Sequence, residues 1–470
     1  MAHQAHAASG PRVDVAIVGA GISGLSAAYE LHSRGLTVRV LESQPRPGGV
    51  IVTERLDGFL VDAGPDSLLM QKPAAPELCR ELGISDRLMT TRPPRTAFVY
   101  RRGRLHAIPD ASILGFPTRL RPLATSSLFS TSAKLRMARE VFSRPRQAVE
   151  DESIATFVRR HFGREAVDYI AEPLLAGIHA GDVDRLSIRA SFPRLLEAEA
   201  SRGSVIRAFA ARGQRHAGDG VFRSLPGGLG ELVEALVSGL PEGTVRCGGM
   251  VHKIELHPLP RVHQAQHDPT EARAIVLATP AWATAPLVLP FDAELARMCD
   301  AIPYWSTATV FLAYPVAAVG HDLRGTGFVV PRSEGLTITA GTWVSSKWAD
   351  RAPAGQVLLR AFLGGARDPH AVDRSNAELI RATERDLGAV LHIQGSPTFA
   401  RVYRWYRASP QQEVGHLTHM AGIDRRLARW PNLFITGTGF RSVGIPDCIA
   451  DGRATARAVV ENWKTFPNAL

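Results

Sequence analysis

The chain has 470 residues, a formal net charge of +10 and a sequence isoelectric point near 9.9. This length suits two or three domains, which can bury about three quarters of the unfolded surface. The basic balance favours anionic partners: acidic lipids, nucleic acid or an acidic small substrate. Because the chain has no aromatic-interleaved basic patch and no zinc-finger spacing, we expect no nucleic-acid partner.

The cysteines and the chain start indicate a reducing compartment. Cys79, Cys247, Cys299 and Cys448 are far apart and form no Cys-x-x-Cys pair, which argues against a disulfide framework or a cysteine metal site. Residues 1–12 lack the apolar core of a secretory signal, and no run reaches about 18 apolar residues. We expect a cytoplasmic protein, free or peripheral on the cytoplasmic face of a membrane.

A glycine-rich turn follows the first predicted strand, Val13–Val18, and opens a helix. The turn consists of Gly19, Ala20, Gly21, Ile22, Ser23 and Gly24. In this pattern the first glycine permits a tight turn, the second lets the backbone approach a pyrophosphate, and the third lets helix and strand pack closely. The phosphates would lie at the helix N-terminus, where free N–H groups favour negative charge.

An acidic residue ends the next predicted strand, Thr37–Leu41. Glu42 can accept hydrogen bonds from ribose hydroxyls and disfavours a 2′-phosphate, so NADP is not expected. The glycine pair Gly48–Gly49 follows a few residues later, which favours a flavin dinucleotide over a nicotinamide one.

The predicted nucleotide-binding domain is discontinuous. A helix over Glu231–Leu240, strands over 244–247, 250–256 and 274–278, and a closing glycine-rich unit from Leu433 that leads into a C-terminal helix complete its pattern. Period-2 runs and a helix near Asn376–Leu391 predict a second, mixed sheet. We therefore expect an α/β chain (α+β overall) with a Rossmann-like FAD-binding domain (13–90, 206–283, 425–466), a helical, basic, membrane-facing region (91–205) and a mixed-sheet substrate domain (284–424).

With these motifs, the chain resembles the FAD-containing amine oxidase superfamily over nearly its full length. Three stretches resemble the protoporphyrinogen oxidase family within it, while Gly327–Pro331 and Thr337–Trp343 resemble its Bacillus-type branch. The three stretches are Ala63–Ser67, Gly177–Asp182 with the following Leu186–Pro193, and Val443–Gly452.

The resemblance implies that non-covalently bound FAD oxidises protoporphyrinogen IX to protoporphyrin IX, with O2 reoxidising the flavin and yielding H2O2. Coproporphyrinogen III is the alternative substrate. The flavin carries the chemistry, so no acid or base side chain is expected. The resemblance implies these FAD contacts: Gly19, Ala20, Gly21, Ile22, Ser23, Gly24, Glu42, Ser43, Gly48, Gly49, Gly64, Pro65, Asp66, Ser67, Val251, Ala278, Thr438, Val443, Gly444 and Ile445.

Substrate contacts follow from the same resemblance. Gly177 would present its carbonyl to the pyrrole N–H groups, Phe328 and Val329 would line the pocket, and His179 is a candidate beside them. Ala97 stands where many relatives carry a propionate-binding arginine, and Arg95, two residues upstream, is a candidate substitute because this offset keeps the same strand face.

Residues 101–146 mix cations with apolar side chains, which favours peripheral contact with an anionic membrane over a solvated basic face. The cations are Arg101, Arg102, Arg104, Arg119, Arg121, Lys134, Arg136, Arg139, Arg144 and Arg146, and the apolar residues are Ile113, Leu114, Phe116, Leu128 and Phe129.

Other interpretations remain open at this point. They are an amine oxidase or polyene desaturase on the same fold, and a flavin-binding or porphyrin-carrying protein without turnover. The histidine pairs His416/His419 and His263/His267 have no cysteine or acidic cluster nearby, so no metal site is expected. A homodimer is neither indicated nor excluded.

Overall fold

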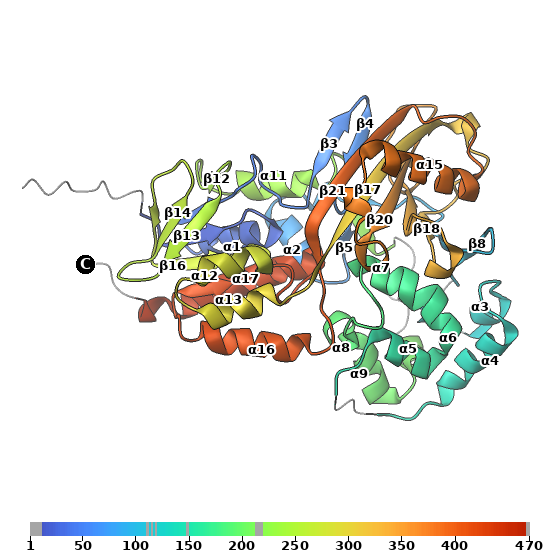
Figure 1. Cartoon of the computed structure of the whole chain (residues 1–470), viewed down its shortest axis with the longest axis horizontal. Helices are drawn as coiled ribbons and strands as arrows, with labels where there is room; N and C mark the ends of the chain where they lie inside the picture. The colour runs from blue at the N-terminus through green and yellow to red at the C-terminus, as the bar shows by residue number, and fades with distance from the viewer. Residues whose placement is uncertain are drawn as a thin grey trace, which may run out of the picture.

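Two large sheets lie toward opposite ends of the long axis of the molecule (Figure 1). This computed structural model describes residues 12–109, 112–113, 116–117, 120–146, 150–211 and 220–466. The strands are β1 (Val15–Val18), β2 (Val38–Leu41), β3 (Thr53–Leu56), β4 (Phe59–Asp62), β5 (Leu68–Leu69), β6 (Met89–Thr90), β7 (Ala97–Arg101), β8 (Arg104–Ala107), β9 (Ser112–Ile113), β10 (Phe116–Pro117), β11 (Phe222–Ser224), β12 (Val245–Arg246), β13 (Val251–Glu255), β14 (Arg261–Gln264), β15 (Thr270–Glu271), β16 (Ala274–Leu277), β17 (Tyr304–Pro315), β18 (Gly327–Val329), β19 (Ala340–Trp343), β20 (Gln356–Gly364), β21 (Phe399–Pro410) and β22 (Leu433–Ile435).

The helices lie around these sheets. They are α1 (Ile22–Ser33), α2 (Ala74–Glu81), α3 (Leu120–Thr125), α4 (Thr131–Arg139), α5 (Ile154–Phe162), α6 (Arg164–Ala166), α7 (Gly177–His179), α8 (Ile188–Ser191), α9 (Pro193–Arg202), α10 (Val205–Ala211), α11 (Gly230–Ser238), α12 (Ala281–Val288), α13 (Ala293–Asp300), α14 (Val344–Lys347), α15 (Asn376–Leu391), α16 (His416–Leu427) and α17 (Ile445–Glu461). A π-helical segment, η3 (Val167–Ala176), joins α6 to α7, and short 3₁₀ turns include η2 (Glu140–Phe142), η5 (Arg332–Glu334) and η6 (Gly365–Arg367).

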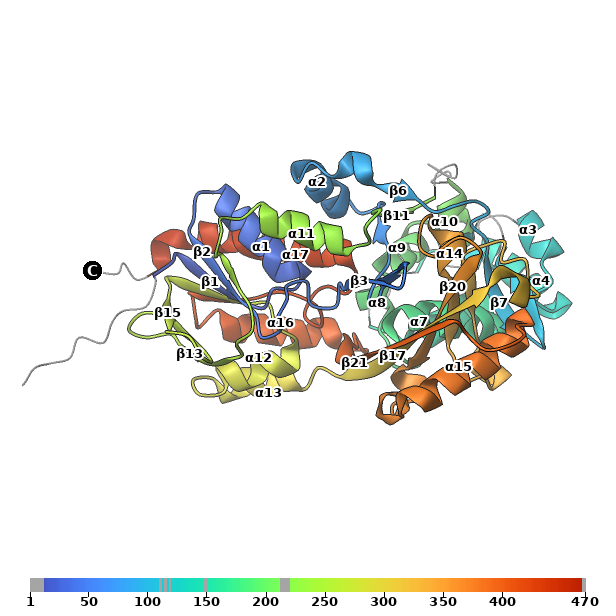
Figure 2. The same cartoon turned by 90° about the horizontal axis from the view of Figure 1, so that it is seen from above.

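The first sheet is parallel, in the order β12-β2-β1-β16-β22. Val15 and Ile17 of β1 pack against α1, α11 and α17, whereas Ala16 and Val18 face α12, α13 and α16. Helices therefore cover both faces, as Figure 2 shows. This burial on two sides explains why these strands have uninterrupted apolar sequences.

The second sheet is mixed, in the order β21-β17-β20-β19-β18-β7-β8. Among the described strands of this sheet, only β18 and β7 pair in parallel. All other neighbouring strands pair antiparallel. Helix α15 covers one face. Helices α3 to α10, which form the helical part of the chain, lie on the other side of the sheet (Figure 1). The predicted helix Asn376–Leu391 is confirmed; a Ser375–Glu378 capping box fixes its start.

The helical part has its own apolar core. Side chains of α4, α5, η3, α8, α9 and α10 form this cluster, and Val99 of β7 also belongs to it. One face of the second sheet therefore packs against the helical part.

The structure corrects the expected domain limits at three places. Strands β7 and β8, within segment 91–205, join the second sheet because β7 pairs with β18 and β8 pairs with β7. Helix α10, mostly assigned to 206–283, packs in the helical core. Helices α13 and α16, within segment 284–424, pack on the parallel sheet because their apolar faces meet Ala16 and Val18. Apolar contacts between distant segments decide these domain limits, so the limits cannot be located from local sequence.

Candidate functional site

The glycine turn after β1 leaves one open position among tightly packed backbone. Gly19 has φ of +104°, and a Cβ there would lie 2.8 Å from the carbonyl oxygen of Ala278. A Cβ on Gly24 would overlap the carbonyl oxygen of Gly19, whereas a Cβ on Gly21 would have no neighbour within 4 Å. Packing therefore explains Gly19 and Gly24, and the free volume at Gly21, at the N-terminus of α1, can accept a phosphate group.

Glu42 faces this turn from the end of β2. Its side chain is buried; Oε2 accepts the Ala20 N–H at 2.7 Å, and Oε1 accepts the Gln44 N–H at 2.8 Å and the Ser43 hydroxyl at 3.1 Å. A carboxylate has about four lone-pair sites, so one remains to accept a hydrogen bond from a ribose hydroxyl. The carboxylate is thus fixed in orientation.

The second glycine pair lies against the first turn. The Gly48 N–H donates to the carbonyl of Ala20 at 2.8 Å, and Gly48 and Gly49 have φ of +106° and +58°. A Cβ on Gly49 would lie 3.3 Å from the Cα of Gly21. A side chain at Gly49 would reduce the space beside the open position, which accounts for glycine there.

Strand β13 begins beside Glu42. The Gly249 N–H donates to the carbonyl of Glu42 at 3.2 Å, and the buried amide of Gln264 donates to the carbonyl of Gly249 at 2.8 Å. Val251, two residues after Gly249, is therefore near the predicted ribose acceptor, in keeping with an adenine neighbour.

The segment Gly64–Ser67 lies between the two sheets. The carbonyl of Ala63 accepts the Thr309 hydroxyl at 3.2 Å and an Arg360 N–H at 3.1 Å, both from the second sheet. A Cβ on Gly64 would overlap the carbonyl of Val50, on the nucleotide side. Contacts from both sides fix this segment.

Asp66 in the same segment forms an ion pair with Lys347 at 2.8 Å and accepts the indole N–H of Trp348 at 3.3 Å. Burial raises the pKa of Asp66, but Lys347 and Arg360 together lower it below its usual range. Asp66 is thus a carboxylate at neutral pH. The sequence motif located Asp66, but it did not predict its partners.

The C-terminal glycine unit meets the start of β17. The Tyr304 hydroxyl donates to the carbonyl of Thr438 at 3.2 Å and accepts the Ala281 N–H at 3.0 Å, while a Cβ on Gly439 would overlap it. Burial raises the pKa of Tyr304 to about 12, so the hydroxyl stays protonated. Thr438 is thereby anchored to the second sheet.

The last helix points its N-terminus at the same region. Gly444 is exposed, and Val443 and Ile445 beside it are partly exposed. Asp447, in the first turn of α17, forms an ion pair with Lys72 at 2.6 Å. The helix dipole favours negative charge here, although Asp447 already occupies part of that position.

The stretch after η3 places Gly177, a residue without a side chain, near the ends of strands of the second sheet. Gly177 is exposed, with no atom within 4 Å of a Cβ placed on it, and Ile178 is 58% exposed. The Ala366 N–H, just beyond β20, donates to the carbonyl of Ala180 at 2.8 Å, and the Gln411 amide donates to the carbonyl of His179 at 2.9 Å. The turn is therefore held at the ends of β20 and β21, close to Tyr304.

These contacts converge on one place between the two sheets. A family profile described as flavin containing amine oxidoreductase matches residues 22–460. The chain belongs to this family. The mixed α/β fold expected from the sequence is that of the family, and FAD is the cofactor; the open position at Gly21 and the carboxylate of Glu42 fit its pyrophosphate and ribose.

Individual relatives agree with this family assignment. A coproporphyrinogen III oxidase of Bacillus subtilis (strain 168) is 34% identical over 94% of this chain and 96% of its own length. Protoporphyrinogen oxidase 2, chloroplastic/mitochondrial, of Arabidopsis thaliana is 28% identical over 99% and 97%. A crystal structure of a provisionally named protoporphyrinogen oxidase from Exiguobacterium sp. 255-15 has a TM-score of 0.85 and 30% identity, covering 97% of this chain and 99% of that one.

In this flavoprotein, the expected substrate contacts fall on different faces. Ala97, Val99 and Val329 follow the helical side of the second sheet, where Val329 packs against the helical core. Phe328 is buried in the opposite core, against Gly341. The expectation that Phe328 lines the same pocket is corrected, because successive strand residues point to opposite faces.

Two further candidates have other contacts. Arg95 precedes β7, and its Nε donates to Thr91 at 2.9 and 3.0 Å, so the structure directs it toward that loop. His179 is buried with its ring edge-on to Phe192, and burial lowers its pKa to about 4. Its Nδ1 has no hydrogen-bond partner among the described residues. It is a neutral, packed histidine at neutral pH.

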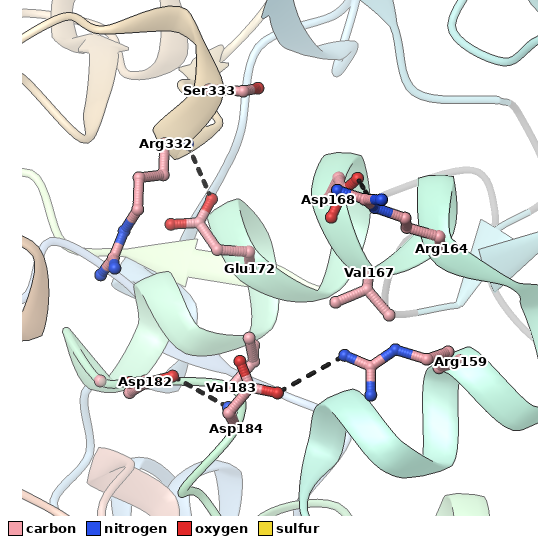
Figure 3. A pocket seen from close by; sticks show the side chains of 11 residues that line it. Arg159, Arg164, Val167, Asp168, Glu172, Asp182, Val183, Asp184, Arg332 and Ser333 are labelled. Atoms are coloured by element: carbon pink, nitrogen blue, oxygen red, sulfur yellow. Dashed lines mark hydrogen bonds and ion pairs between the residues drawn. The ribbon is translucent and has the colours of Figure 1, made fainter.

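A cavity of about 460 Å³ lies on another side of the Gly177–Asp182 stretch (Figure 3). Its charged groups bind one another: Arg159 pairs with Asp184 and Arg164 with Asp168, each at 3.5 Å. Glu172 of η3 accepts the Arg332 N–H at 3.1 Å. The contact between Glu172 and Arg332 ties the helical part to the second sheet.

Within the described ranges, no three His, Cys, Asp or Glu side chains are grouped to hold a metal ion. His416 and His419 face the carbonyls of Phe440 and Met298 at 2.7 and 2.8 Å. In the same part of the chain, no helix combines the length and apolar character that crossing a bilayer requires.

Proposed function

We propose that this flavoprotein oxidises protoporphyrinogen IX to protoporphyrin IX, with O2 as the final electron acceptor and H2O2 as its product. The observation that carries the proposal is Gly177, an exposed backbone position held between the flavin-side segments and the second sheet. A large macrocycle can approach this backbone closely because Gly177 carries no side chain. Amine oxidation would give this turn no purpose.

Bound FAD supplies the hydride acceptor. The protein holds the substrate against it and keeps water out, a role that suits the partly buried Val329 and the exposed Ile178. The carbonyl of Gly177 accepts the Ala180 N–H at 3.2 Å, and its second lone pair can accept a pyrrole N–H.

Coproporphyrinogen III is a second candidate substrate. The relative at 34% identity is named for this substrate, whereas the two relatives named above for protoporphyrinogen are at 28% and 30% identity. The two molecules share the macrocycle and differ in propionate number. Because Ala97 has no cationic side chain, other groups would have to bind the propionates of either substrate.

A parallel assay of both porphyrinogens tests the proposal. Purified protein loaded with FAD should consume O2 and produce porphyrin fluorescence with at least one of them. The ratio of the two kcat/KM values then assigns the substrate. Flavin-loaded protein that gives no porphyrin from either would refute the proposal, and oxidation of amines instead would favour the amine oxidase alternative.

We also propose that the activity is cytoplasmic, with the protein in peripheral contact with an anionic membrane. Helix α4 lies at the outer edge of the helical part (Figure 1), and Leu135 of α4 and Phe142 of η2 are 63% and 82% exposed. Lys134 and Arg139 lie in the same stretch of chain. Apolar side chains among cations suit the surface of an acidic bilayer. Leu114 and Arg119 lie outside the described residues, as do the side chains of Ile113 and Phe116.

Vesicle co-sedimentation tests this contact. The protein should sediment with vesicles that contain anionic lipid and not with purely zwitterionic ones, and Phe142→Ser should reduce the bound fraction. Equal binding by Phe142→Ser and the parent would exclude this stretch as the contact.

A further inference from the structure

A buried arginine without an ion-pair partner in the described part of the structure lies next to Ala63, the residue before the segment Gly64–Ser67 that is expected to contact the flavin. Arg360 is in the middle of β20 and is 6% exposed. It donates to the carbonyl of Ala63 at 3.1 Å, and its guanidinium lies over the rings of Phe362 and Phe311 at 4.3 and 5.4 Å. No carboxylate of the described chain forms an ion pair with it, and its Nε has no hydrogen-bond partner there.

Arg360 is charged in spite of this burial. Burial lowers its pKa to about 10, while Asp66 and Asp62 act in the opposite direction. An uncompensated charge in a protein interior is costly and is usually neutralised or paired. A group that becomes negative during function would account for a cation kept here.

The charges around Arg360 do not balance. Asp66 pairs with Lys347 at 2.8 Å, and Asp62 is 3.5 Å from Arg351. Three cations thus face two carboxylates, which leaves one positive charge in excess. Burial raises the pKa of Asp62, and its protonation would increase that excess.

The surrounding charges do not remove the excess. Arg55 and Glu231 also act on Arg351, with opposite effects on its pKa, and Glu231 is itself paired with Arg87 at 2.9 Å. Near α17, Lys72 and Asp447 pair with each other. The described groups therefore leave the positive excess next to Ala63.

We propose that Arg360 and Lys347 stabilise the negative charge of the reduced flavin, so that these two cations set the reduction potential of the bound cofactor. The proposal rests on the proposed function and on the expected flavin contact of Gly64–Ser67. Transfer of a hydride, one proton with two electrons, from a substrate carbon adds one negative charge to the flavin; the substrate N–H proton leaves separately. A positive excess lowers the free energy of that product.

The test is the midpoint potential of bound FAD, measured by spectroscopic titration against reference dyes without any porphyrinogen. Arg360→Met removes the charge and keeps an apolar stem. We expect it to lower the two-electron equilibrium constant for reduction at least tenfold, which is about 30 mV. Sulfite, which adds to oxidised flavin and leaves a negative charge, should bind at least tenfold more weakly.

Three variants separate charge from structure. Arg360→Lys should restore most of the potential, and Asp66→Asn, which removes a negative charge from the cluster, should raise it. Arg367→Met is the control: this partly buried arginine pairs with Glu172 at 3.3 Å, outside the cluster, and should leave the potential unchanged.

Unchanged potential and sulfite affinity in Arg360→Met would overturn the proposal, as would a shift of the same sign in Arg360→Met and Asp66→Asn. If Arg360→Met does not retain FAD, Lys347→Met takes its place with the same expected direction. Because no porphyrinogen is used, failure of the substrate assignment would leave this result intact, and the reverse also holds.

Discussion

Gly177→Ala isolates the substrate-facing role of one backbone position. Gly177 has φ of −57° and ψ of −35°, values that alanine adopts without strain, and a Cβ there meets nothing within 4 Å. Alanine is favoured over glycine in a helical conformation by about 1 kcal/mol, so the variant should fold and melt within about 2 °C of the parent. FAD content should also be unchanged.

The methyl group would instead occupy the space into which the substrate must come. Loss of one hydrogen bond to the Gly177 carbonyl costs about 1 to 1.5 kcal/mol, which corresponds to roughly a tenfold lower kcat/KM. Steric exclusion would add to this loss. Gly177→Leu should therefore be more severe than Gly177→Ala.

Steady-state fluorescence kinetics with both porphyrinogens measure the effect. Gly388→Ala is the matched control, because Gly388 is within α15 and a Cβ there would lie 3.9 Å from its nearest atom, the carbonyl oxygen of Ile393. It should gain similar stability and keep the parent kcat/KM. Parent activity in Gly177→Ala, toward both substrates, would refute the reasoning.

Three further predictions concern the cofactor and pH. Glu42→Gln should weaken FAD binding by about 10- to 100-fold, the value of a charge-assisted hydrogen bond; calorimetry on apoprotein measures it, and parent affinity would exclude Glu42 as the ribose acceptor. Gly21→Ala should leave the melting temperature of the apoprotein unchanged but abolish tight FAD binding, whereas Gly24→Ala should destabilise the apoprotein through its overlap with Gly19; the reverse pattern would contradict the geometry. His179 has a pKa lowered from 6.5 to about 4, so the folded protein loses stability as the pH falls from 6.5 towards 4, by about 2 kcal/mol at pH 5. Denaturant unfolding at pH 7 and pH 5 should show a smaller loss in His179→Phe, and equal losses would argue against a neutral buried imidazole.

Local sequence predicted the nucleotide side of the fold and helix α15 well, because each signal lies within a few residues. The turn Gly19–Gly24 is tied to strand and helix packing, and the capping residues Ser375 and Glu378 mark where α15 begins. These patterns depend on short-range sterics and hydrogen bonds.

The second sheet was harder to predict because its face assignments depend on register. Phe328 and Val329 are both apolar neighbours, and only the pairing of β18 with β7 and β19 decides which one faces the helices. The hairpin of β7 and β8 joins this sheet across more than 200 residues of sequence, which no local pattern reveals.

The charge cluster at Arg360 was missed for a similar reason, since its members come from three separate stretches of the sequence. One signal was present: an arginine at the centre of the apolar run Gln356–Gly364. A charged residue in a buried strand marks either a pairing partner or a ligand, and the sequence alone could not supply the partner.

Anaerobic mixing of the FAD-loaded protein with each porphyrinogen tests the central claim most directly. We expect the flavin absorbance to bleach in the first turnover while substrate hydrogens are removed, and admission of air to restore the oxidised flavin and continue porphyrin formation. Flavin that stays oxidised with both porphyrinogens, in protein that dithionite reduces normally, would contradict the account.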